Sequence, residues 1–234
     1  MYHLPSIDWP RDKKYDCISM SSKFKRNQVE DAIVQTLRAR DQARVDELKL
    51  RLRRLLTTDR RLGINARSDD EVERHYAFYS QKPQGSGFEV MFTGYEAFAL
   101  LAAIMLLEHG LPQSRAVAVM RRVRKQFEVA HAETLKKDPS KLFDQEAVRA
   151  QAKPGMIATN NMDPVFLVLV GLTGSSVDAR GAATAVCRGH VALGEFFGKH
   201  HGRGATFFEV VGWMHTLAAN LSQTQPVKRG RGAT

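Results

Sequence analysis

Hydrophobic positions recur at spacings of three and four residues along much of the chain, which predicts a mainly helical protein. In the N-terminal half, one such stretch carries Val29, Ile33 and Leu37, and a second covers residues 45–56. The segment between them, 40–42, is polar, so the sequence allows either a tight turn or one continuous long helix.

Two further helices are predicted on either side of Gly110. Thr93 and Glu96 have the spacing of a capping box, so a helix should begin there. This helix is apolar on almost every side, as expected at the centre of a core. Gly110 suits its end and Pro112 suits the first turn of the next helix, which is predicted from residue 113 towards residue 135.

The remaining pattern mixes short strands with one more helix. Residues 88–92 alternate between apolar and polar side chains, residues 165–170 form a continuous apolar run, and residues 182–187 form a weaker strand candidate. Thr206-Phe-Phe-Glu209 has the spacing of a second capping box, which predicts a final amphipathic helix over residues 207–221.

Charge is where the composition departs from the average. The 234 residues are 43% apolar and 26% charged, which excludes a fibrous or wholly disordered chain. The 35 Lys and Arg exceed the 25 Asp and Glu, so the formal net charge is +10. Such a surface favours polyanionic partners: nucleic acid, an anionic membrane face or an acidic protein.

Cysteine usage and the apolar runs predict a cytoplasmic location. Cys17 and Cys187 are too far apart in sequence to indicate a disulfide framework or a paired metal knuckle. The first residues carry charge and proline where a signal peptide needs an apolar core. The most apolar stretch, 97–107, is about half of the ~20 residues that a membrane span requires, so we expect no membrane partner.

Catalytic and metal-binding motifs are weak in this chain. The glycine-rich run 198–204 has neither P-loop order nor GxGxxG spacing, and we expect it to be a turn before the last helix. No GxSxG elbow is present. We therefore expect no enzyme, no cofactor and no metal. One group of residues includes potential metal ligands, but their spacing does not reproduce that of a standard structural zinc site: Cys187, His190, Glu195, His200 and His201.

The helix pair around Gly110 is the strongest candidate for a functional surface. An apolar helix, a Gly-Leu-Pro turn and a basic second helix have the outline of a helix-turn-helix. The capped helix and its glycine end are formed by Thr93, Glu96, Leu100, Leu106, Gly110 and Leu111. Over about residues 93–119 this arrangement resembles the wing helix pair of MerR-type transcription regulators. The resemblance implies a homodimeric DNA-binding protein whose helix-turn-helix precedes this region, within residues 29–56.

Basic residues gather on the helix after Gly110, on residues 38–61 and at both ends of the chain. The planar fork of arginine can contact a phosphate or a guanine, and about six or more phosphate contacts would make binding steeply salt-dependent. We predict the following DNA-binding residues: Arg44, Arg51, Arg53, Arg54, Arg60, Arg61, Arg115, Arg121, Arg122, Arg124, Lys125, Lys228, Arg229 and Arg231.

The same residues have ordinary explanations. A charged helix face can be stabilised by pairs such as Glu47–Arg51 at i,i+4, and basic ends often serve only solubility. An interaction or scaffold protein with an acidic partner is therefore an alternative function, and RNA binding is a third. For the preferred function, replacing Arg121 and Arg122 together by alanine should weaken DNA affinity without unfolding the protein.

Together these patterns predict an α+β protein. A mainly helical N-terminal region with helix-turn-helix-like elements and a short strand or hairpin is followed by a small C-terminal α/β module. We expect a double-stranded-DNA-binding homodimer in transcriptional control, associated with the nucleoid; the sequence indicates no particular small-molecule effector. The predicted parts are a basic arm (1–26), a helical DNA-binding region (27–152), an α/β dimerisation or partner module (153–225) and a basic tail (226–234).

Overall fold

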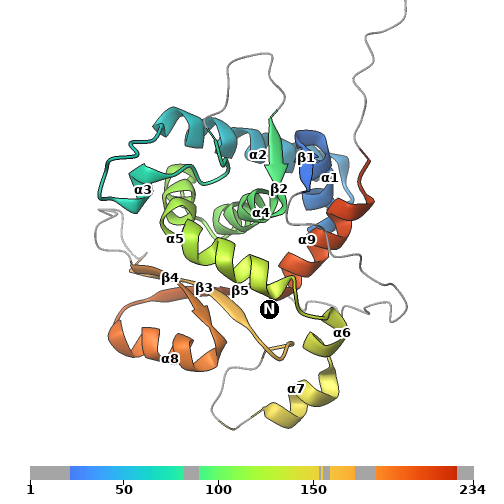
Figure 1. The fold of residues 1–234 in the computed structure, drawn as a ribbon, viewed down its shortest axis with the longest axis vertical. Helices are drawn as coiled ribbons and strands as arrows, with labels where there is room; N and C mark the ends of the chain where they lie inside the picture. The colour runs from blue at the N-terminus through green and yellow to red at the C-terminus, as the bar shows by residue number, and fades with distance from the viewer. Residues whose placement is uncertain (1–21, 82–89, 153, 155–158, 172–182, 226–234) are drawn as a thin grey trace, which may run out of the picture.

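The computed structural model describes residues 22–81, 90–152, 154, 159–171 and 183–225. Most of the predicted basic arm and the whole predicted tail, with Lys228, Arg229 and Arg231, lie outside these residues. The described part is an α+β fold in which helices form the larger layer and a small antiparallel sheet lies beside them (Figure 1), so the predicted fold class is confirmed.

The helical layer is built around α4 (Gly94–Glu108), which packs against α1 (Arg26–Thr36), α2 (Gln42–Leu62), α5 (Gln113–Thr134) and α9 (Val211–Gln223). The predicted capping box is present, because the Glu96 amide donates to Thr93 Oγ1 at 3.1 Å and the Thr93 amide donates to the Glu96 carboxylate at 2.8 Å. Gly110 adopts a φ of 84° after α4, a conformation that favours glycine.

The three-stranded sheet has the order β4 (Ala183–Arg188), β3 (Val165–Val170), β5 (Ala205–Glu209), with both pairings antiparallel. Leu167 and Leu169 of β3 belong to the main core shared with the helices, whereas Phe166 and Val168 face a second core closed by α8 (Gly189–Lys199). Because β3 is covered on both faces, its sequence is continuously apolar.

The predicted capping box at residues 206–209 is wrong. These residues lie in β5, where Phe208 pairs with Leu167 and Phe207 pairs with Val168. Pairing with β3 outweighs the local capping pattern, since it buries Phe208 and satisfies the backbone within a sheet. The helix begins instead at Val211, so the run 198–204 precedes a strand.

The N-terminal elements differ from the predicted arm in one respect. Residues Lys23–Lys25 form β1, which pairs antiparallel with β2 (Met91–Thr93) and places Phe24 opposite Phe92. For the polar segment 40–42 the sequence allows either a turn or one continuous helix. In the structure the helix is interrupted, because α1 ends at Thr36 and α2 begins at Gln42. Asp41 caps the second helix by accepting from the Arg44 amide at 3.2 Å.

The shorter helices connect these layers. Their bounds are α3 (Glu71–Arg74), α6 (Pro139–Leu142) and α7 (Gln145–Gln151). The last helix, α9, packs against α1, and Asn220 Nδ2 donates to Thr36 Oγ1 at 2.9 Å. The main hydrophobic core therefore contains residues from both sides of the predicted boundary at residue 153. None of the helices in the described ranges combines the length and the apolar character of a membrane span.

Candidate nucleic-acid interface

The second half of α2 carries a concentrated group of exposed cations. Arg53 and Arg60 are seven residues apart, as are Arg54 and Arg61, so each pair repeats after about two helical turns, or roughly 10 Å along the axis. The four side chains lie opposite the buried leucines of α2, and all four residues are exposed. We call Arg53, Arg54, Arg60 and Arg61 the α2 arginine face.

The α2 arginine face is largely free of neutralising carboxylates. Across the described ranges, no carboxylate lies within ion-pair distance of Arg54, Arg60 or Arg61. Arg53 Nε lies 4.0 Å from Glu30, whose carboxylate already accepts from Arg26 at 2.6 Å. Arg60 hydrogen-bonds the Tyr79 hydroxyl, a neutral partner that leaves the guanidinium charge in place. The face therefore retains its positive charge.

The first half of α2 is different because its predicted DNA-binding arginines are paired. Arg44 contacts both Glu47 and Glu108, and Arg51 contacts Glu47. The hydrogen bond from Arg44 is the largest of the influences that lower the pKa of Glu47. The charges of these arginines are therefore neutralised by acidic neighbours. For Arg51 the partner is Glu47, the i,i+4 pair that the sequence predicts.

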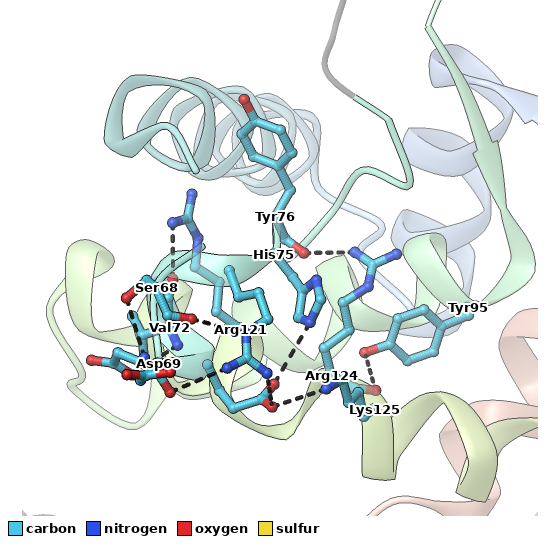
Figure 2. Close-up of polar contacts among 12 residues, drawn as sticks. Ser68, Asp69, Val72, His75, Tyr76, Tyr95, Arg121, Arg124 and Lys125 are labelled. Carbon is cyan, nitrogen blue, oxygen red and sulfur yellow. Dashed lines mark hydrogen bonds and ion pairs between the residues drawn. The ribbon is translucent and has the colours of Figure 1, made fainter. Parts of the chain in front are cut away.

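Arg121 on α5 is not a surface residue, and its predicted contact with DNA is contradicted by its burial. Its side chain is 3% exposed, and Nε donates to the carboxylate of Asp59 on α2 at 2.7 Å. One terminal nitrogen donates to the backbone carbonyl of Asp59 at 2.7 Å. The other donates to the backbone carbonyl of Val72 at 3.0 Å (Figure 2). A guanidinium whose donors are used inside the fold cannot also bind a phosphate.

Arg124 is corrected for the same reason. One terminal nitrogen donates to the carbonyls of Tyr76, Ala77 and Tyr79, at 2.6, 3.2 and 3.0 Å. Figure 2 shows the contact with Tyr76 and the Tyr95 ring, over which the guanidinium lies. Since these carbonyls belong to an irregular segment, Arg124 supplies the donors that a strand or helix would otherwise provide. Arg124 thereby holds residues 76–79, which follow α3, against α5.

The other basic residues of α5 do not form a common exposed face. Lys125 is exposed but donates to Glu71 at 2.9 Å, and Arg115 and Arg122 are half-buried. The helix is packed by α2, α3, α4, α9 and β4. Of the two basic helices singled out in the sequence, α2 is thus the one that presents an open cationic surface.

Sequence reasoning missed Asp59, which accepts from the amides of Ala77 and Phe78 at 3.1 and 3.0 Å as well as from Arg121. Burial raises the pKa of Asp59, while the two amides and the guanidinium oppose that rise. A signal was present: Asp59 continues the apolar stripe of α2 at the i+4 position from Leu55, where only a partnered carboxylate can be buried.

Comparisons of the chain with protein families, with curated proteins and with solved structures find no match. The described ranges contain no group of three His, Cys, Asp or Glu side chains placed to hold a metal ion.

Proposed function

We propose that this protein binds double-stranded DNA through the α2 arginine face. The observation that carries the proposal is that these arginines are exposed and have no ion-pair partner closer than 4.0 Å among the residues that the structure describes, while the arginines earlier on the same helix are neutralised. A polyanion would supply the missing counter-charges, and arginine binds phosphate through a planar fork of donors.

The face is long enough to contact more than one phosphate. Arg53 and Arg54 lie roughly 10 Å along the helix axis from Arg60 and Arg61. Successive phosphates of one DNA strand are separated by about 3.4 Å along the duplex axis. Contacts of this kind position a protein on DNA without reading sequence. A regulatory role in transcription and a homodimeric state stay predictions from the sequence.

Replacing Arg54 and Arg61 together by alanine should weaken binding to a random duplex at least roughly 10-fold near 0.1 M salt, because two phosphate contacts are lost. The slope of log affinity against log salt should fall in magnitude by about 1.8, since each contact contributes about 0.9. Fluorescence anisotropy of a labelled random 20-base-pair duplex between about 50 and 200 mM salt measures both quantities.

The matched control replaces Arg44 and Arg51 by alanine. It removes the same charge from the same helix, but at side chains already paired with Glu47 and Glu108, so affinity and slope should change much less. If both double variants lost the same affinity for DNA, net charge alone would explain the effect. The α2 arginine face would then not be the binding surface. Absence of duplex binding by the unmodified protein at low salt would overturn DNA binding, and preference for an acidic peptide or duplex RNA would point to the alternative functions.

A further inference from the structure

The exposed cations of the α2 arginine face form two rows along the helix. At about 100° per residue, Arg53 and Arg60 project within about 20° of each other around the helix axis, and so do Arg54 and Arg61. The two rows are about 100° apart. They therefore lie on either side of a central strip of the helix surface.

The central strip carries Leu50 and Thr57, and helical geometry places both about midway between the two rows. Both residues are exposed, and Leu50 is 45% exposed although it is large and apolar. Thr57 Oγ1 donates to the Arg53 carbonyl at 2.9 Å, which leaves the oxygen lone pairs and the methyl group for an external contact. The strip is thus uncharged and partly apolar, with guanidinium groups on both sides.

Acidic residues mark where this cationic surface begins. Asp46 and Glu47 are exposed one turn before Leu50. Between residues 48 and 62 the sole carboxylate is Asp59, whose side chain is fully buried. The exposed surface of α2 from residue 50 to residue 61 therefore carries cations and no anion of its own. A polyanion is expected to contact this part of the helix and not its beginning.

The arrangement matches the major groove of B-form DNA. The groove is about 12 Å wide and about 8.5 Å deep, and an α-helix with its side chains is about 10–12 Å across. A helix in this groove has a sugar-phosphate backbone on each flank and base edges in front of it. Two rows of arginines beside an uncharged strip provide donors for both backbones and an apolar surface for the bases. The minor groove, about 6 Å wide, is too narrow for the helix.

We propose that α2 lies in the major groove, with one row of arginines on the phosphates of each strand. Leu50 then contacts the C5-methyl group of a thymine, which is the apolar group that the bases display in this groove. The position in the groove rests on the proposed DNA binding. It adds a preference for thymine-containing sites to phosphate contacts that carry no sequence information.

The test compares a labelled A·T-rich duplex with the same duplex in which deoxyuridine replaces every thymine and so removes only the C5-methyl groups. Near 0.1 M salt the deoxyuridine duplex should bind the unmodified protein about 4-fold more weakly, the effect of losing one buried methyl group. Fluorescence anisotropy measures both affinities. The slope of log affinity against log salt should be the same for the two duplexes, because the phosphate contacts do not change.

Two leucine variants of α2 separate the groove contact from other effects of the altered base. Leu50→Ala should bind the thymine and deoxyuridine duplexes equally. Leu62→Ala is the matched control, because Leu62 is 50% exposed but lies about 120° around the helix axis from Leu50. This control should keep the full thymine preference. Thermal unfolding checks that both variants retain the fold.

The outcomes distinguish the groove contact from DNA binding itself. If the unmodified protein bound both duplexes equally, with a steep salt dependence, the position of Leu50 in the major groove would be wrong while DNA binding would stand. A thymine preference that persisted in Leu50→Ala would also exclude this contact. Absence of binding to either duplex at low salt would overturn both proposals.

Discussion

Replacing Asp59 by alanine should lower the free energy of unfolding by about 4 kcal/mol, within the range of about 3–5 kcal/mol found when one member of a buried ion pair is removed. The Asp59 side chain is fully buried, and its loss leaves the Arg121 guanidinium and the amides of Ala77 and Phe78 without their acceptor. Urea unfolding monitored by circular dichroism measures the change. A loss below about 1 kcal/mol would show that the network does not hold the fold.

A double-mutant cycle separates the pair from its surroundings. Arg121→Ala should be comparably destabilising, and the double variant should lose less than the sum of the single losses, by about 1–3 kcal/mol. Lys125→Ala is the matched control on the same helix, because its ion pair with Glu71 is exposed and should contribute less than about 1 kcal/mol. This result would also reverse the expectation from sequence that Arg121 can be removed without unfolding.

The fold was predictable wherever local chemistry decides it. The Thr93–Glu96 capping box and the continuous apolar run of β3 are both local signals, and both elements form. The Thr206–Glu209 pattern has the same local spacing but lies in β5, because its decisive interaction is with residues about forty positions earlier in the chain. A capping pattern cannot reveal such a partner.

The candidate site was harder to predict than the fold. The basic residues of α2 and α5 look alike in sequence, yet Arg54 is exposed and Arg121 is buried. The difference depends on which faces the neighbouring helices cover and on Asp59, whose carboxylate fits Arg121 only after α2 and α5 pack together. Arg121 lies four residues after the buried Val117 and therefore on the same side of α5. This spacing indicates that the side of α5 that carries Arg121 is also covered.

Two buried histidines should make the protein sensitive to acid. His131 on α5 stacks on Phe98 at 5.2 Å between ring centroids and lies edge-on to Tyr95. Burial lowers the pKa of His131 to about 4, and the neighbouring His215 contributes to the decrease. Burial also lowers the pKa of His215 to about 4, although a hydrogen bond that the Thr134 backbone carbonyl accepts from the ring and the charge of Asp138 oppose this decrease.

The direction of the effect follows from proton binding. In the unfolded chain these histidines titrate near 6.5, whereas the folded protein keeps them neutral down to about pH 4. The unfolded state therefore binds more protons between these values, and stability falls as the pH decreases through that window. With 1.36 kcal/mol for each pKa unit, the loss amounts to about 3 kcal/mol for each histidine. Well above pH 6.5 both states keep the two residues neutral, so they contribute no pH dependence to stability.

His131→Phe keeps an aromatic ring against Phe98 but removes one titration. With pKa values of 6.5 unfolded and about 4 folded, unfolding takes up most of one proton per histidine between pH 6 and pH 5. The two histidines should therefore give a slope of about 2.3 kcal/mol per pH unit there, and His131→Phe should halve it. Urea unfolding at pH 7, 6 and 5 measures the slopes, and carboxylates common to both proteins cancel in the difference. His201→Gln, an exposed control, should keep the full slope. If the His131→Phe variant also kept the full slope, His131 would already be protonated in the folded protein. Its buried ring, stacked on Phe98, would then carry a positive charge.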